Sequence, residues 1–152
     1  MTDGDVMMKC EIRKCRLEDA ASICELNRDD LGYDFPLQET KDNLEKILES
    51  ENDRIYVAIY NGEVAGYVHA CTYQLAYASQ MKNLMALAVA KKYRKKGIGQ
   101  ALLNKAETWA KEDGANGIRL VSGTPRKGAH AFYQSCGYKL IKEQYNFMKL
   151  FN

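Results

Sequence analysis

The chain has 152 residues, of which 46% are hydrophobic, and its 22 basic and 20 acidic side chains leave a net charge of +2. This length predicts one domain that buries a core, and the near balance of charge excludes a protein whose overall field attracts nucleic acid or an anionic membrane. The five cysteines are odd in number and form no C-x-x-C pair, which argues against a zinc ribbon or a complete disulfide framework and favours reduced thiols.

Nothing in the sequence resembles a linker, a repeat or a membrane span. The longest apolar run, Leu84 to Ala90, is far short of the roughly 20 residues that cross a bilayer. No apolar signal segment is visible near the N-terminus. We therefore expect a cytoplasmic protein with no membrane partner, built as one domain over residues 1–152 with a flexible start at residues 1–8.

The first third of the chain predicts a strand followed by two helices. Alternating side chains at residues 9–15 indicate the strand. A helix is expected from Leu17 to Asp30, with acidic residues in its first turn, and Gly32 ends it. Pro36 then opens a second helix, whose apolar stripe comprises Leu37, Leu44, Ile47 and Leu48.

The clearest local signal is RIYVAIYNGEVAGYVHACTY, residues 54–73. Two β-rich runs are joined there by Asn61-Gly62, the dipeptide that supplies the two positive φ angles of a tight type I′ turn. The segment therefore predicts an antiparallel hairpin of the second and third strands.

The rest of the chain predicts a strand, helix and strand, and then a closing hairpin. NLMALAV, residues 83–89, is apolar on both faces and indicates a buried strand. A helix is expected at 97–113, and GIRLVS, 117–122, resumes the sheet. The helical period predicts that this helix buries Ile98, Leu102, Ala106, Trp109 and Ala110. A short helix at 127–136 precedes YKLIKE and YNFMKLF, within 138–151, which predict the hairpin.

These elements together predict the fold. A strand–helix–strand crossover is right-handed and joins parallel strands, so strands four and five should be parallel. We expect an α/β fold (α+β in some schemes) with a mixed, mostly antiparallel central sheet of about 6–7 strands. Helices should cover both faces of the sheet.

A basic stretch with two glycines, KKYRKKGIGQALL at residues 91–103, lies between the buried strand and the following helix. A Walker loop needs Lys-Ser or Lys-Thr after its second glycine, and a dinucleotide fingerprint needs a third glycine where Leu102 stands. What remains is R-x-x-G-x-G, whose glycines let the backbone approach a pyrophosphate at the positive end of a helix dipole. The alternative is a solvated basic face beside an ordinary strand–helix connection.

Two segments together resemble a known family. LMALAVAKKYRKKGIGQALL, residues 84–103, is similar to the central motif of the GNAT superfamily of acetyl-CoA-dependent N-acetyltransferases, and AHAFYQSCGYKL, residues 129–140, to its following helix-and-strand motif. The resemblance implies transfer of an acetyl group from acetyl-CoA directly to a primary amine in a ternary complex, without a metal. It also implies that strands four and five splay apart.

The resemblance assigns the acetyl-CoA site by position. The pantetheine arm would pair with the backbone of Leu87, Ala88 and Val89, and the N–H of Leu87 would stabilise the oxyanion that develops during transfer. Arg126 would reach the adenosine end. The pyrophosphate would lie on the turn into the helix, which comprises Arg94, Lys95, Lys96, Gly97, Ile98, Gly99 and Gln100.

Tyr133 occupies the family's position for the general acid, next to the cofactor's sulfur. A phenol with an ordinary pKa of about 10 stays protonated at neutral pH and can donate to a thiolate whose acid has a pKa near 8.5. The alternative is that Tyr133 only packs within the apolar stripe of its helix.

The base that receives the amine proton is not identified by the resemblance. Some family members have a glutamate at the position of Asn83, and an asparagine cannot do that work. A water relay or another residue would serve instead, and His69 is one candidate because imidazole titrates near neutral pH. A histidine on a strand is also commonly a packing residue.

The acceptor site is expected near the loop between the first two helices. Tyr33 and Asp34 belong to this loop, and Asp34 would attract a cationic amine. Tyr73 and His69 share a strand face that would wall the site. These residues suit a small-molecule or a peptide amine equally, and a homodimer is compatible with the sequence.

Two other functions compete with the enzyme. The chain could hold CoA or acetyl-CoA as a sensor or partner domain without turnover, which the missing glutamate favours. A nucleic-acid binder that uses KKYRKK is the weaker alternative, because no recognition motif and no basic excess accompany the cluster.

Overall fold

The computed structural model describes residues 10–152, so the flexible start predicted at residues 1–8 lies outside the described part. Contacts divide the chain into two compact units, one that ends at Val121 and one from Ser122 to Asn152. The first unit contains the sheet, and the second contains helix α5 (Lys127–Ser135).

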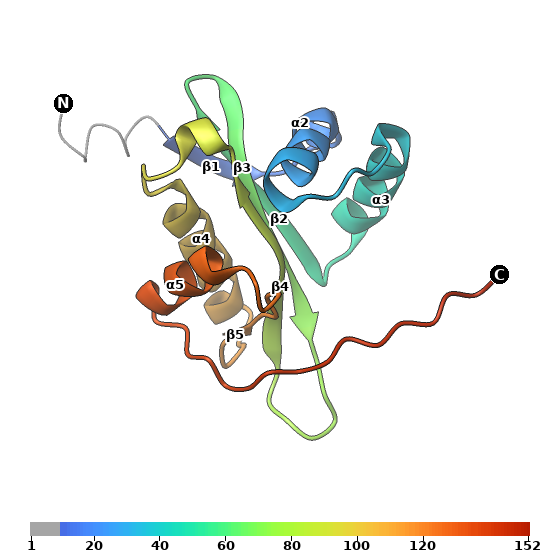
Figure 1. Ribbon diagram of the computed structural model, residues 1–152, viewed down its shortest axis with the longest axis vertical. Helices are drawn as coiled ribbons and strands as arrows, with labels where there is room; N and C mark the ends of the chain where they lie inside the picture. The colour runs from blue at the N-terminus through green and yellow to red at the C-terminus, as the bar shows by residue number, and fades with distance from the viewer. Residues whose placement is uncertain (1–9) are drawn as a thin grey trace. The chain divides into compact units, whose positions relative to one another are not determined.

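The first unit is a five-stranded sheet with its strands in chain order (Figure 1). The first four strands pair antiparallel with their neighbours, and the fifth is parallel to the fourth, as the crossover predicted. The strands are β1 (Cys10–Lys14), β2 (Asp53–Tyr60), β3 (Glu63–Tyr73), β4 (Met81–Val89) and β5 (Ile118–Arg119).

The β2–β3 hairpin follows from its turn residues. Asn61 and Gly62 have φ angles of 52° and 77°, the left-handed conformation that a type I′ turn requires. Tyr60 pairs with Glu63 on either side of the turn. The predicted hairpin is therefore confirmed.

Helices cover both faces of this sheet. On one face a 3-10 turn (Leu17–Asp19), α2 (Ala20–Leu26) and a π-helical turn (Asn27–Leu31) continue one another, and Gly32 ends them with a φ of 81°. α3 (Leu37–Glu49) begins after Pro36 on the same face, and α4 (Ile98–Glu112) covers the opposite face (Figure 1). None of the helices in residues 10–152 has the length and apolar character needed to span a bilayer.

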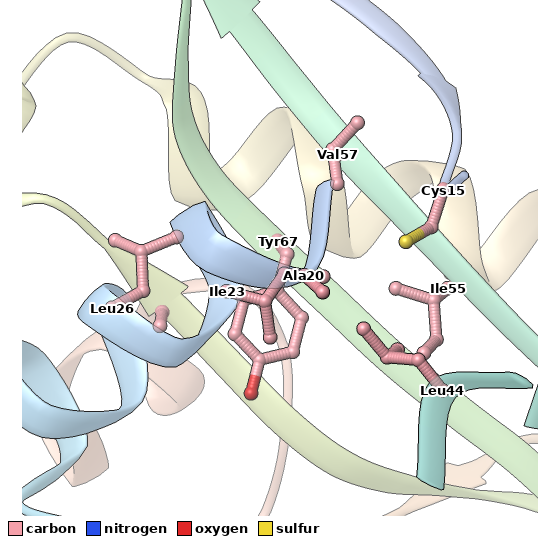
Figure 2. Close-up of a cluster of buried hydrophobic side chains, with 9 residues drawn as sticks. Cys15, Ala20, Ile23, Leu26, Leu44, Ile55, Val57 and Tyr67 are labelled. Carbon is pink, nitrogen blue, oxygen red and sulfur yellow. The ribbon is translucent and has the colours of Figure 1, made fainter. Parts of the chain in front are cut away.

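Apolar packing holds both layers. On the α2 and α3 face, Figure 2 shows a buried cluster of Cys15, Ala20, Ile23, Leu26, Leu44, Ile55, Val57 and Tyr67. The buried face of α4 comprises Ile98, Leu102, Leu103, Ala106, Trp109 and Ala110, which contains the stripe that the helical period predicts. Gly66 of β3 lies under this helix, since a Cβ there would be 3.2 Å from Leu102 Cδ1 and 2.6 Å from the Ala88 carbonyl oxygen.

A buried lysine fixes the start of β4. Lys82 is fully buried, donates to Thr72 Oγ1 at 2.9 Å, and pairs with Asp113 at the end of α4. Its Nζ lies 4.1 Å from the centre of the Trp109 ring. These contacts hold the end of β4 at which β5 pairs.

The predicted closing hairpin is wrong for the described residues. YKLIKE and YNFMKLF form no strand, and GIRLVS contributes only Ile118–Arg119, so the sheet has five strands rather than 6–7. Alternating apolar residues favour a strand only where a neighbouring edge receives their N–H and C=O groups. The apolar side chains left exposed are Leu140, Ile141, Tyr145, Phe147, Met148, Leu150 and Phe151.

Candidate active site

The edge of β4 that faces β5 is open along most of its length. β5 pairs with β4 only at Lys82 and Asn83 and ends at Arg119, so among the described residues no strand pairs with this edge of β4 from Leu84 to Val89. The N–H of Ala90 donates to the Ala65 carbonyl of β3 at 2.8 Å. Because N–H directions alternate along a strand, the N–H groups of Leu87 and Val89 point to the open edge.

The turn between β4 and α4 presents backbone N–H groups. Lys95 and Gly97 adopt left-handed φ angles of 64° and 79°, which is uncommon for a lysine. Gly97 is the N-cap of α4 and supplies no side-chain cap, so the first helical turn has N–H groups available to a ligand. This arrangement suits an anion at the positive end of the helix dipole.

Asp30 connects the β4 edge with this turn, and no sequence pattern singled it out as a site residue. Its Oδ2 accepts a hydrogen bond from the Val89 N–H at 3.2 Å, and its Oδ1 forms an ion pair with the Arg94 guanidinium. The Asp30 side chain is 10% exposed and that of Arg94 47%. The Val89 N–H and the Arg94 guanidinium, which were both predicted to bind the cofactor, are therefore bound by the Asp30 carboxylate.

A pocket of about 160 Å³ lies between the two helices of the α2 and α3 face and the strands β2 and β3. The Tyr67 hydroxyl donates to Asn27 Oδ1 at its wall, and burial raises the pKa of Tyr67 to about 12, so the phenol is protonated. The His69 Nε2 atom lies 2.8 Å from Asp53 Oδ1. The pocket is lined by apolar side chains, such as Ile23, Leu44 and Ile55, and by neutral polar ones, such as Asn27, Thr40 and Asn43.

The structure gathers the predicted acceptor residues only in part. Among the described residues that line this pocket, His69 is the one member of the predicted set. Tyr33 is 67% exposed and Asp34 is exposed in the segment before α3. Tyr73 ends β3, where the Arg119 guanidinium carbon lies 4.4 Å from its ring centre. A larger pocket of about 310 Å³ lies near the end of α3, on the side of β1 and β2, where no site residue was predicted.

Two predicted site residues belong to the second unit. Arg126 is the N-cap of α5. Tyr133 is half-buried in that helix, with its ring centre 5.4 Å from that of Phe132 and 5.9 Å from that of Tyr138. Burial raises the pKa of Tyr133, and the charge of Arg126 opposes this more weakly. The phenol therefore keeps its proton through the neutral range.

The comparison with protein families decides the assignment. Residues 20–138 match the family model described as the acetyltransferase (GNAT) family. The chain belongs to the acetyltransferase (GNAT) family. Transfer of an acetyl group from acetyl-CoA to an amine is accordingly its activity, and the comparisons give the non-catalytic alternative no support.

Two curated relatives and one solved structure resemble this GNAT acetyltransferase. It is 34% identical over 140 residues to the aminoalkylphosphonate N-acetyltransferase of Salmonella typhimurium (89% of this chain, 88% of the relative). It is 33% identical over 134 residues to an uncharacterised N-acetyltransferase of Chlorobaculum tepidum (88% and 78%). The aminoglycoside N-acetyltransferase AAC(6')-Iy in complex with CoA has a TM-score of 0.82 at 15% identity (92% and 94%), which shows a shared fold.

The acetyltransferase lacks a carboxylate base at the start of β4. Arg119 Nη1 donates to Asn83 Oδ1 at 2.5 Å, and Asn83 Nδ2 lies 3.0 Å from Met85 Sδ. The Asn83 amide is thus held between two neighbours and has no basic atom of its own. The sequence prediction did not identify Arg119, because its contact with Asn83 depends on the short parallel pairing.

The residues of the acetyltransferase fit an acetyl-CoA molecule at the β4 edge and the turn before α4. The edge N–H of Leu87 matches an amide carbonyl of a pantetheine arm, and that of Val89 matches another once Asp30 releases it. The left-handed turn with an uncapped helix start matches a pyrophosphate. Within residues 10–152, no group of three or more His, Cys, Asp or Glu side chains is arranged to hold a metal ion.

Proposed function

We propose that this GNAT acetyltransferase acetylates the primary amine of a small molecule. The observation that carries the proposal is the open edge of β4 leading into the left-handed, uncapped turn before α4. A small-molecule acceptor is supported by the name of the 34% identical relative, an aminoalkylphosphonate N-acetyltransferase. A peptide acceptor has less support, because the pocket beside β3 has a volume of only about 160 Å³.

The proposed roles divide between backbone and side chains. Acetyl-CoA supplies an acyl group activated as a thioester. Leu87, Ala88 and Val89 hold its pantetheine arm through main-chain groups, and the Leu87 N–H stabilises the charge that develops on the thioester oxygen. The amides from Lys95 to Gln100 bind the pyrophosphate, Arg94 supplies further positive charge to it, and Arg126 binds the adenosine end. Tyr133 protonates the departing thiolate.

We further propose that the protein is a single catalytic domain, is cytoplasmic and forms a homodimer. A single catalytic domain is supported by the family match, which spans residues 20–138 and so includes parts of both units. A cytoplasmic location is supported by five free cysteines, which suit a reducing compartment. A homodimer is supported by the seven exposed apolar side chains between Leu140 and Phe151, which a second copy would cover.

Removal of the Asp30 carboxylate should tighten acetyl-CoA binding. In Asp30→Ala the Val89 N–H and the Arg94 guanidinium are released, and a negative charge near the phosphates is lost. We expect the Kd for acetyl-CoA, measured by calorimetry, to fall about three- to tenfold.

Asp29→Ala is the matched control for this change. Asp29 is the adjacent residue, carries the same charge, and pairs with Arg28 on the surface, with 66% of its side chain exposed. It should change the Kd less than twofold, because surface charges are screened. Weaker binding in Asp30→Ala at unchanged thermal stability would show instead that Asp30 positions Arg94 for the ligand.

The experiment that tests the function is an amine screen. Purified protein is incubated with acetyl-CoA and a panel of aminoalkylphosphonates, aminoglycosides, polyamines, amino acids and a peptide with a free N-terminus, and release of the CoA thiol is followed. At least one small amine should release the thiol faster than buffer and yield the N-acetyl product by mass spectrometry. Release by the peptide alone would overturn the small-molecule proposal.

A further inference from the structure

His69 and Asp53 form a sheltered pair whose chemistry the roles above leave unused. The two side chains are 14% and 22% exposed, and His69 Nε2 lies 2.8 Å from Asp53 Oδ1. They come from neighbouring strands: His69 of β3 pairs with Ile55 of β2, two residues beyond Asp53. The sheet therefore fixes the spacing of the pair.

The His69 imidazole lines the pocket of about 160 Å³, which is the proposed acceptor site. His69 shares a strand face with Tyr67, which belongs to the cluster on the α2 and α3 side, and both residues line the pocket of about 160 Å³. On its other side, His69 pairs with Ala86 of β4, one residue before Leu87. His69 thus lines the pocket and belongs to the strand next to the one whose open edge carries the Leu87 amide.

The contact with Asp53 sets the tautomer. A carboxylate only accepts hydrogen bonds, so the neutral imidazole keeps its proton on Nε2 and has its lone pair on Nδ1. An imidazole held in this tautomer offers the Nδ1 lone pair that a general base needs.

We propose that His69, oriented by Asp53, accepts the proton that the acceptor amine loses during acetyl transfer. This proposal rests on the proposed function. An alkyl amine with a pKa near 10.4 is neutral in only about one molecule in 2,500 at pH 7, so a proton acceptor is needed. The ammonium first gives a proton to Nδ1, and the neutral nitrogen then forms a bond to the acyl carbon. The carbon–sulfur bond breaks with its electron pair on sulfur, which takes the Tyr133 proton, and the remaining surplus proton of the nitrogen restores the Tyr133 phenol.

Few titratable groups compete with this pair. Asp53 is the charged group beside the imidazole, and the residues that α2 and α3 contribute to the pocket are neutral, such as Asn43 and Thr40. Tyr67 is protonated, since burial raises its pKa to about 12. Cys71, the next residue on the same strand face, is also kept neutral because burial raises its pKa.

The test compares pH profiles of His69→Gln, Asp53→Asn and wild type with the best amine from the screen. His69→Gln should lower kcat about tenfold at pH 7 and regain at least half of the wild-type rate at pH 9, where more of the amine is already neutral. Asp53→Asn should also lower kcat at pH 7, because an asparagine amide can donate as well as accept and no longer holds the imidazole proton on Nε2. Acetyl-CoA affinity and thermal stability should stay within twofold and about 2 °C of wild type in His69→Gln.

His130→Gln is the matched control, because His130 is the second of the two histidines in the chain and contacts the Gly123 carbonyl of its own unit. His130→Gln should keep the wild-type dependence of kcat on pH. An unchanged profile in His69→Gln, with the wild-type enzyme active, would remove His69 as the base and leave the proposed function intact. If wild type acetylates no amine although it binds acetyl-CoA, both proposals fail together.

Discussion

Tyr133→Phe should lower kcat about a hundredfold and leave the Kd for acetyl-CoA within about twofold. The phenol is the proposed acid for the thiolate, and acids in this role typically contribute two to four orders of magnitude. Burial raises the pKa of Tyr133, so its proton is present across the neutral range and the phenylalanine ring preserves the packing against Phe132 and Tyr138. Stopped-flow release of the CoA thiol, with cofactor affinity from calorimetry, separates the two effects.

A second tyrosine supplies the control for this substitution. Tyr138 lies near Tyr133 in the same unit, and the two ring centres are 5.9 Å apart. Tyr138→Phe removes a hydroxyl from the same ring cluster without touching the proposed acid, so kcat should change less than threefold. A Tyr133→Phe enzyme with the wild-type rate would exclude the hydroxyl from the mechanism and return Tyr133 to a packing role.

Much of the fold could be predicted because the signals are local. Asn61-Gly62 fixed the hairpin through its two positive φ angles, and the 3.6-residue period identified the buried face of α4. The position of Gly97, at the N-cap of α4 with a φ of 79°, follows from the same kind of local reasoning. Local backbone preferences are visible in one sequence, and these elements depend on little else.

The prediction of a closing hairpin was wrong for a physical reason. YKLIKE and YNFMKLF have the alternation of strands, but pairing requires a sheet edge at the right place, and a sequence pattern does not supply one. In the described residues β5 is only two residues long, so little edge extends beyond β4. The prediction counted strands from propensity and so overestimated the sheet.

The side-chain contacts at the site could not be predicted because they join distant residues. Asp30 contacts Val89 and Arg94, which are 59 and 64 residues away in the sequence. Asp53 contacts His69 across the β2–β3 hairpin. Without knowledge of this contact, the sequence could not distinguish a catalytic base from a packing residue at His69. Residue type gave the candidates, and the tertiary register decided which of them meet.

Gly97→Val should weaken acetyl-CoA binding about thirtyfold or more. A β-branched residue strongly disfavours the φ of 79° that Gly97 adopts, so the turn must rotate and its N–H groups leave the pyrophosphate. A hydrogen bond to a charged group contributes about 1.5–3 kcal/mol, and about 2 kcal/mol corresponds to thirtyfold in Kd. The loss should appear in affinity rather than in the chemical step at saturating cofactor.

Gly114→Val at the other end of α4 is the matched control. Gly114 has nearly the same φ, 77°, and no atom lies within 4 Å of a Cβ built there. Both variants should lose about 1–2 kcal/mol of stability from left-handed strain. Gly114→Val should keep the wild-type Kd, because this turn lies at the C-terminal end of the helix, where no cofactor role is proposed.

The most direct measurement is the acetyl-CoA Kd of these two variants by calorimetry, side by side with wild type. If main-chain amides at the start of α4 hold the pyrophosphate, Gly97→Val binds at least thirtyfold more weakly while Gly114→Val and wild type bind alike. Equal affinities for all three proteins, with both variants folded, would contradict the assignment of the cofactor to this turn.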